Sequence, residues 1–216
     1  KSVMAKELGR DFFDDIPFEI MRLKKGRVGI LLADVSGKGI PAALFMALSR
    51  IVIRVNALWH PEPADAIKDA NNIIAADSKA GMFVTAFYGI IDEESRVLTY
   101  VNAGHNPPMV VHAADKSTEE LAATGIVLGA MEDVLYTQKT LRIAQGDVVV
   151  LYTDGVTEAI NAAQEMFGED RLRKIIVENA ARPSSDILSA ILDAIAAFSG
   201  DQPQADDITL MVIRGV

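Results

Sequence analysis

The chain has 216 residues, of which half are apolar and none is cysteine, so it can bury a sizeable core but cannot form disulfides or use thiolate chemistry. Its formal net charge of -9 at pH 7 disfavours nucleic acids and anionic membranes as partners, because both carry negative charge. No uninterrupted apolar run reaches the roughly 20 residues that span a bilayer, and no signal peptide is recognisable. We therefore expect a cytoplasmic protein with a single domain over residues 1–216.

The first part of the chain predicts a β-hairpin. Residues 18–23 alternate like a strand with one wet face, and the apolar run at residues 28–33 is the expected partner strand. Asp11 lies near the start of the first strand, and Asp34 follows the second directly. Because the strands of a hairpin run antiparallel, these two aspartates are expected to be neighbours.

Two consecutive helices are predicted after the hairpin, over residues 40–58 and 63–77. In the first helix, apolar residues recur at three- and four-residue spacing, so we expect one wide buried face. The residues assigned to that face are Leu44, Phe45, Leu48, Ile51, Val52 and Val55. In the second helix the inward residues are expected to be Ala66, Ile67, Ala70, Ile73 and Ile74. This pair predicts a helical layer on one sheet.

The rest of the chain predicts more strands and a second helix pair. Strands are expected at residues 82–91, 97–103 and 109–113, as a three-stranded meander, and at 136–143, 148–153 and 208–213. A short helix or loop is expected over 156–163, and helices over 169–181 and 184–198, the last capped by Ser184 or Ser185. The order predicts an α+β fold: a four-layer αββα sandwich of two antiparallel sheets flanked by helix pairs.

Four aspartates are candidate metal ligands: Asp11, Asp34, Asp154 and Asp206. Asp34 and Asp154 follow fully apolar strands, where a carboxylate is costly unless a cation or hydrogen bonds compensate its charge. Oxygen ligands suit hard cations such as Mg²⁺ or Mn²⁺, and two ions that share a carboxylate can hold a bridging hydroxide and polarise a phosphoryl oxygen. Asp34 is the preferred shared ligand, because glycines frame its turn. Taken singly, each aspartate is equally compatible with a turn former or a helix cap.

Five stretches resemble the SpoIIE/RsbU-type branch of the PPM (protein phosphatase 2C-like) family. They are residues 34–43 (DVSGKGIPAA), 82–89 (MFVTAFYG), 102–108 (NAGHNPP), 151–159 (LYTDGVTEA) and 206–210 (DDITL). They occur in the order that the family has, and the resemblance covers about residues 8–213. It implies an αββα sandwich and a metal-dependent phosphoserine/phosphothreonine protein phosphatase.

The resemblance also implies roles for individual residues. Asp34 would bridge two divalent ions, Mn²⁺ or Mg²⁺, and the backbone carbonyl of Val35 would bind the second ion. Asp154 and Asp206 would complete the site of the first ion. Asp11 would support the second ion, directly or through water. The three catalytic residues implied are therefore Asp34, Asp154 and Asp206.

The family also suggests partners. Its members typically act on a small phosphorylated anti-sigma-factor antagonist and often carry sensor domains upstream. We therefore expect a phosphorylated protein substrate of this kind and an upstream sensor domain in the full-length chain, with residues 1–216 as the C-terminal phosphatase domain of a longer multidomain protein.

One position departs from the family, which usually has Gly-Gly before its first aspartate where this chain has Gly9-Arg10. The forked guanidinium of Arg10 could bind a substrate phosphate, although a solvated arginine is the simpler interpretation. Lys38 is a second candidate, and His105 could act as a general acid or merely shape its loop. The remaining candidates, which could orient metal ligands or be confused with one, are Thr153, Thr157, Glu158 and Asp207.

Two other functions stay open at this point. One is a catalytically silent regulatory module that binds a phosphoprotein without turnover. The other is a two-metal phosphodiesterase or nuclease, which the charge of -9 disfavours. The helix at residues 40–58 leads directly out of the Asp34 turn, so its displacement, or homodimer packing on it, could gate activity.

Overall fold

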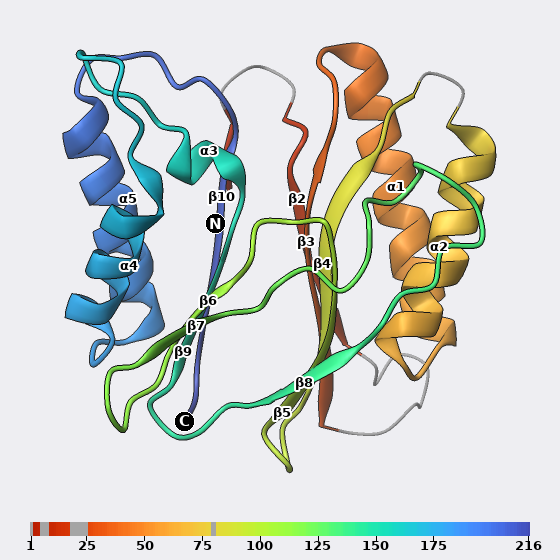
Figure 1. Cartoon of the computed structure of the whole chain (residues 1–216), viewed down its shortest axis with the longest axis horizontal. Helices are drawn as coiled ribbons and strands as arrows, with labels where there is room; N and C mark the ends of the chain where they lie inside the picture. Colours follow the sequence, from red (N-terminus) through yellow and green to blue (C-terminus); the bar gives the residue numbers. More distant parts are fainter. Residues whose placement is uncertain (1, 5–8, 18–25, 79–80) are drawn as a thin grey trace. The chain divides into compact units, whose positions relative to one another are not determined.

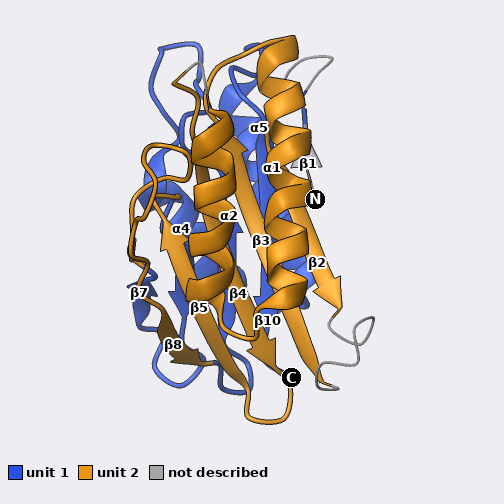
Figure 2. Cartoon of the chain, turned by 90° about the vertical axis from the view of Figure 1, so that its right-hand side faces the viewer, with its two compact units in different colours: residues 1–9, 106–121, 143–216 blue, residues 10–105, 122–142 orange. Residues whose placement is uncertain are grey.

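The computed structural model describes residues 2–4, 9–17, 26–78 and 81–216. The contacts between residues divide the chain into two compact units that interleave along the sequence (Figure 2). Unit 1 comprises residues 1–9, 106–121 and 143–216, and unit 2 comprises residues 10–105 and 122–142. The single domain over residues 1–216 stays a prediction, and the units are described separately below.

Unit 2 is built on a five-stranded antiparallel sheet with the strand order β2-β3-β4-β5-β8 (Figure 1). Its strands are β2 (Phe12–Pro17), β3 (Arg27–Val35), β4 (Val84–Asp92), β5 (Val97–Ala103) and β8 (Lys139–Arg142). Phe12 pairs with Ala33, so Asp11 and Asp34 lie at the same end of the β2–β3 pair, as predicted. The strand expected at residues 18–23 lies outside the described residues.

Two helices of unit 2, α1 (Ile40–Trp59) and α2 (Pro63–Asp77), lie along one face of this sheet (Figure 1). Both begin with proline in the first turn, where its missing N–H is not needed. Ile53 of α1 and Ile67 and Ile74 of α2 are fully buried in the core that the helices share with the sheet. The predicted helix pair and its layer are confirmed, but Ile73, which was predicted to face inward, is 46% exposed.

The buried face of α1 differs from the predicted one. Leu44, Leu48, Ile51 and Val55 are 67, 40, 62 and 47% exposed, and only Phe45 among the six predicted residues is buried. The face that is buried carries smaller residues as well: Ala42, Phe45, Ser49, Ile53 and Ala57. Because α1 is apolar on more than one side, periodicity alone could not decide which side meets the sheet.

An ion pair fixes the orientation that α1 adopts. Arg54 Nη1 lies 2.5 Å from Asp14 Oδ1, and Arg50 Nε lies 3.5 Å from Asp14 Oδ2. Asp14 is 4% exposed on β2, and a buried carboxylate without cationic partners is strongly unfavourable. Rotating α1 to bury its larger apolar residues would therefore break this contact.

The opposite side of α1 presents apolar side chains to solvent. By length and composition α1 also passes as a membrane-spanning helix, with 28% of its most apolar window buried, although core helices of soluble proteins pass the same test. The exposed side chains follow one another at three- and four-residue spacing and are called the α1 stripe below. They are Ile40, Leu44, Leu48, Ile51, Val55 and Trp59.

Unit 1 contains a second five-stranded antiparallel sheet, with the order β1-β10-β9-β6-β7. Its strands are β1 (Ser2–Val3), β6 (Met109–Val111), β7 (Thr118–Glu120), β9 (Val148–Tyr152) and β10 (Ile208–Arg214). The prediction that β6 continues the meander of β4 and β5 is wrong, because β6 pairs with β7 and β9 instead. All residues of β6 and β9 are buried, as expected for fully apolar strands whose side chains are covered on both faces of their sheet.

Three helices complete unit 1: α3 (Asp154–Thr157), α4 (Gly168–Asn179) and α5 (Ser184–Ser199). Helices α4 and α5 lie along one face of the sheet (Figure 1) and bury Leu172, Ile176, Ile187 and Ile191 in its core. The predicted serine cap is wrong, because Pro183 is the N-cap of α5 and no side chain caps the helix. The α+β class with two antiparallel sheets and two helix pairs is confirmed.

Candidate metal centre

Asp34 lies in unit 2 near the end of β3, a strand whose residues 29–33 are all buried. It is the next-to-last residue of β3 and pairs with Thr85 of β4. The turn that follows contains Gly37 and Gly39 with φ angles of 95° and 78°, a region that glycine adopts without strain. Ser36 fastens this turn to the chain before β4, since its N–H donates to Phe83 O and its Oγ accepts from Phe83 N. The half-buried Asp34 carboxylate is therefore held on a rigid support.

Arg10 contacts the same turn. Its Nη1 donates to Gly37 O at 2.6 Å and lies 3.5 Å from Val35 O. Asp11 follows immediately and is half-buried at the start of β2. The contacts seen for Arg10 are thus with backbone carbonyls around Asp34, including the carbonyl predicted to be a metal ligand. Lys38, on the other side of Gly37, is exposed.

His105 is buried in unit 2 behind Asp34. It is 3% exposed, and its ring Nδ1 lies 2.9 Å from Thr85 Oγ1. The backbone N–H of His105 donates to Asn102 Oδ1 at 2.8 Å. Thr85 in turn donates to Asp34 O at 3.4 Å. Thr85 was not among the predicted site residues, although its place opposite Asp34 within the motif at residues 82–89 was a signal for it.

Asp154 and Asp206 come together in unit 1. Asp154 is the first residue of α3, directly after β9, and Asp206 lies just before β10, which pairs with β9. Gly155 lets the two loops touch: a Cβ atom there would lie 2.0 Å from Asp207 O and 3.2 Å from Asp206 O. No other residue fits at position 155 without moving these loops.

Hydrogen bonds hold the two loops in place. The buried Thr153 hydroxyl donates to Asp207 O and accepts from Thr209 N, at 3.3 and 3.0 Å. Asp206 Oδ1 accepts from Asp207 N at 2.7 Å, and Asp206 O accepts from Gln204 Nε2 at 2.7 Å. Thr153 therefore links the two loops to each other. The two neighbouring aspartates differ in exposure, because Asp207 is 3% exposed and Asp206 is half-buried.

The carboxylates of unit 1 lie close enough to influence one another. Burial raises the pKa of Glu158, and the negative charges of Asp154 and Asp206 raise it further. Like charges that raise a neighbour's pKa are relieved when a cation binds between them. Glu158 thus reports an acidic environment around Asp154 and Asp206, which suits a divalent ion.

A cavity of about 370 Å³ adjoins this pair of loops. It lies between α5 and the loop before β10, and its lining includes Gly155, Leu192, Gln204 and Ala205. Two of these residues are the immediate neighbours of Asp154 and Asp206 in the chain. The carboxylate pair therefore has a concave, partly apolar surface beside it in unit 1.

The predicted site residues thus form two groups. One group, in unit 2, comprises Arg10, Asp11, Asp34, Val35, Lys38 and His105, and the other, in unit 1, comprises Thr153, Asp154, Thr157, Glu158, Asp206 and Asp207. Within the described part of either unit, no three His, Asp or Glu side chains gather into a group that could hold a metal ion by themselves. That Asp34, Asp154 and Asp206 share one metal centre stays a prediction. The proposed metal ligands in both groups, which are aspartate carboxylates and the Val35 carbonyl, bind through oxygen atoms, and oxygen ligands fit Mg²⁺ or Mn²⁺.

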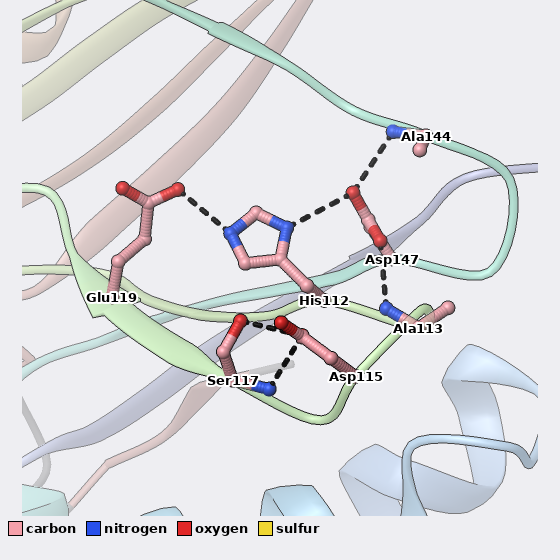
Figure 3. A network of polar contacts seen from close by, with 7 residues as sticks. All are labelled: His112, Ala113, Asp115, Ser117, Glu119, Ala144 and Asp147. Carbon is pink, nitrogen blue, oxygen red and sulfur yellow. Dashed lines mark hydrogen bonds and ion pairs between the residues drawn. The ribbon is translucent and has the colours of Figure 1, made fainter.

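A separate polar network in unit 1 surrounds His112 (Figure 3). His112 Nε2 lies 2.9 Å from Glu119 Oε1, and His112 Nδ1 lies 3.4 Å from Asp147 Oδ2. The buried Asp147 also accepts from the N–H groups of Ala113 and Ala144. This network ties the β6–β7 hairpin to the turn before β9, so His112 has a structural role in unit 1.

Comparison with known proteins identifies the family. The sequence model described as Stage II sporulation protein E (SpoIIE) matches residues 24–215. The chain belongs to the SpoIIE family. The predicted resemblance to the SpoIIE/RsbU-type branch of the PPM phosphatases is therefore confirmed.

A relative with an assigned activity agrees with this family. The phosphoserine phosphatase RsbU of Bacillus subtilis is 31% identical over 213 residues, which cover 99% of this chain and 61% of RsbU. This SpoIIE-family chain thus spans less than two thirds of that relative.

Solved structures show the same fold. The SiaA-PP2C domain of Pseudomonas aeruginosa has a TM-score of 0.85 at 22% identity, over 100% of this chain and 85% of that one. The RsbU and RsbW domains of Rv1364c from Mycobacterium tuberculosis have a TM-score of 0.82 at 23% identity, over 99% and 58% of the two chains. The fold of this SpoIIE-family chain is therefore that of PP2C domains.

Proposed function

We propose that this chain is a metal-dependent protein serine/threonine phosphatase that hydrolyses phosphoserine or phosphothreonine on a regulatory protein. The observation that carries the proposal is the match to the SpoIIE family over residues 24–215. Three of the five stretches that resemble the family contain the proposed ligands Asp34, Asp154 and Asp206. RsbU, the relative at 31% identity, is named a phosphoserine phosphatase.

The proposed metal centre uses the two groups of oxygen donors. Asp34 is the ligand shared by two ions, Mn²⁺ or Mg²⁺, with the Val35 carbonyl and Asp11 at the second ion and Asp154 and Asp206 at the first. Divalent ions held there would supply a Lewis acid and a water of lowered pKa. Burial is the main cause that raises the pKa of Glu158, and the charges of Asp154 and Asp206 raise it further, which shows that the two proposed ligands act on a common neighbour.

The remaining residues act on the ligands rather than on the substrate. Thr85 and His105 stand behind Asp34 and brace its backbone carbonyl through the Thr85 hydroxyl. Thr153 holds the loops of Asp154 and Asp206 against each other. Rigid ligands of this kind bind a metal without a large cost of reorganisation.

The substrate we propose is a phosphorylated protein of the anti-sigma-factor antagonist type, and an upstream sensor domain would control the activity in the full-length, cytoplasmic protein. The family supports this choice. The cavity beside Gly155 and Ala205 is a surface on which residues that flank the phosphorylated serine can lie.

A homodimer is part of the proposal. The α1 stripe leaves six large apolar side chains exposed at the spacing of a helix–helix contact. Since α1 begins directly after the Asp34 turn, packing on this helix would act on the proposed shared ligand.

The proposal is tested by activity and metal dependence measured together. We expect hydrolysis of p-nitrophenyl phosphate and of a phosphoserine protein to require Mn²⁺ or Mg²⁺, and Asp34→Asn or Asp206→Asn to lower kcat/KM by about a hundredfold or more. Asp201→Asn, an exposed aspartate in the loop before Asp206, is the matched control and should retain activity.

Two results would contradict this function. Turnover that needs no divalent ion, or that survives Asp34→Asn, would exclude the metal mechanism. Metal binding by calorimetry without turnover of any phosphoprotein would favour the silent regulatory module instead. A panel of nucleotide substrates tests the phosphodiesterase alternative.

A further inference from the structure

We propose that the guanidinium of Arg10 occupies the cation-binding side of the turn after β3 and thereby weakens the binding of the second divalent ion. The inference rests on the proposed function in one respect, because it takes the Val35 carbonyl as a ligand of that ion. It concerns the residue at which this chain departs from the Gly-Gly pattern of its family.

The first argument is geometric. One nitrogen atom, Arg10 Nη1, lies 2.6 Å from Gly37 O and 3.5 Å from Val35 O. The two carbonyl oxygens therefore face a common position, and the positive φ of Gly37, 95°, allows this bend. Backbone carbonyls that converge on one point are typical of cation sites. In this turn the cation at that point is the guanidinium of Arg10.

The second argument is electrostatic. A guanidinium keeps its charge at every physiological pH, and two cations a few ångströms apart repel each other strongly near a partly buried surface. A divalent ion that binds the Val35 carbonyl must therefore displace Arg10 or bind beside it.

The third argument is the position of Arg10 in the chain. It directly precedes Asp11, which is the other protein ligand proposed for the second ion. The long side chain of Arg10 can leave Gly37 by a change of rotamer, so the guanidinium can be displaced while the ion binds at the adjacent Asp11. Arg10 thus acts as a built-in competitor of the second ion, and a substrate or partner that attracts the guanidinium would favour metal loading.

The alternative role for Arg10 predicts the opposite sign. If its hydrogen bonds only brace the turn, removing them loosens the Val35 carbonyl and weakens the second ion. If Arg10 competes with that ion, removing it strengthens binding. The direction of the change in metal affinity therefore separates the two roles.

The experiment titrates Mn²⁺ into the intact protein and follows binding by calorimetry and by the electron paramagnetic resonance signal of free Mn²⁺. The variants are Arg10→Gln, Arg10→Gly and Arg10→Lys. We expect the first two to tighten the weaker Mn²⁺ site by about tenfold, while Arg10→Lys, which keeps a charge, leaves it weak. Melting curves without metal verify that each variant is folded.

Lys38→Gln is the matched control. Lys38 follows Gly37 in the same turn and is exposed, so the variant removes the same charge from the turn but leaves the Arg10 contacts in place. We expect its effect on the weaker site to be less than about threefold, because exposed charges are well screened.

Several outcomes would overturn the inference. An unchanged or weaker second site in Arg10→Gln and Arg10→Gly excludes competition, while two-site Mn²⁺ binding in the same titration leaves the proposed function intact. An equal gain in Lys38→Gln would show that the charge of the turn, and not the Arg10 contact, sets the affinity. If no variant binds Mn²⁺ at all, both the inference and the proposed metal centre fail.

Discussion

Gly155 shows how a single missing side chain shapes the candidate site. The loops of Asp154 and Asp206 approach so closely that a Cβ atom at position 155 would lie 2.0 Å from Asp207 O. The approach involves backbone on both sides, so neither loop can yield by turning a side chain.

Gly155→Ala should therefore be costly. We expect it to lower the free energy of unfolding by about 2–3 kcal/mol and to reduce Mn²⁺-dependent activity, measured by urea unfolding and by hydrolysis of p-nitrophenyl phosphate. Gly168→Ala is the comparison: it has a φ of 77° but no atom within 4 Å of the added carbon, so it should cost only about 1 kcal/mol. Equal effects of the two variants would contradict the steric explanation.

His112 gives a pH dependence at the same scale. Burial is the largest influence on the His112 pKa and lowers it, but the hydrogen bonds and charges of Asp147 and Glu119 outweigh burial together. The net pKa is therefore raised above its ordinary value of 6.5. The protonated imidazole is favoured in the folded state, so its stabilising contribution is complete below the unfolded pKa and is lost as pH rises through the folded pKa.

We expect this contribution to appear as a difference between two proteins. The free energy of unfolding of the wild type minus that of His112→Gln should be largest below about pH 6.5 and shrink at higher pH. Urea unfolding over a series of pH values measures it. A difference that stays constant, or grows, with rising pH would show that the ion pairs of His112 do not stabilise the fold in this way.

At the scale of the element, α1 shows the limit of periodicity. Its apolar residues predicted a helix correctly, from Ile40 to Trp59, but four of the six residues predicted to be buried face solvent. The ion pairs from Arg50 and Arg54 to Asp14 decide the orientation, and a contact with a residue on another element cannot be read from the helix pattern.

The α1 stripe makes a testable prediction about assembly. If a second copy of the chain packs on it, Ile51→Asp should shift the protein toward monomer in sedimentation or light scattering, because a charge in an apolar contact is costly. Asp65→Lys, a change of charge at an exposed residue of α2, is the control. A wild type that stays monomeric at high concentration would exclude this form of homodimer.

Strand pairing shows a second limit at this scale. The strands β4, β5 and β9 lie close to their predicted positions, but β6 joins the sheet of the other unit. The three-residue β7 was not predicted, since Thr118–Glu120 is exposed and carries no apolar signal. Local patterns predict that a segment forms a strand. The strand with which it pairs depends on how both paired strands are buried in the fold.

For the whole molecule, the proposed centre needs ligands from both units. We expect saturating Mn²⁺, at about one hundred times its Kd, to stabilise the protein by about 2.7 kcal/mol for each ion bound. Asp34→Asn in unit 2 and Asp154→Asn in unit 1 should each remove most of that gain in thermal unfolding, whereas Asp201→Asn should not. If only the substitutions in one unit matter, the two groups of carboxylates do not share a centre.

The sequence by itself determined most of the elements, the α+β class and the family, because these depend on local periodicity and on motifs that occur in a fixed order along the chain. It also pointed to the candidate aspartates, since they follow apolar strands. Only the tertiary structure decided which face of α1 is buried, which sheet receives β6, and that Arg10 binds the carbonyls of the Asp34 turn. Each of these depends on contacts between residues far apart in the chain, whose energies do not appear in any single segment.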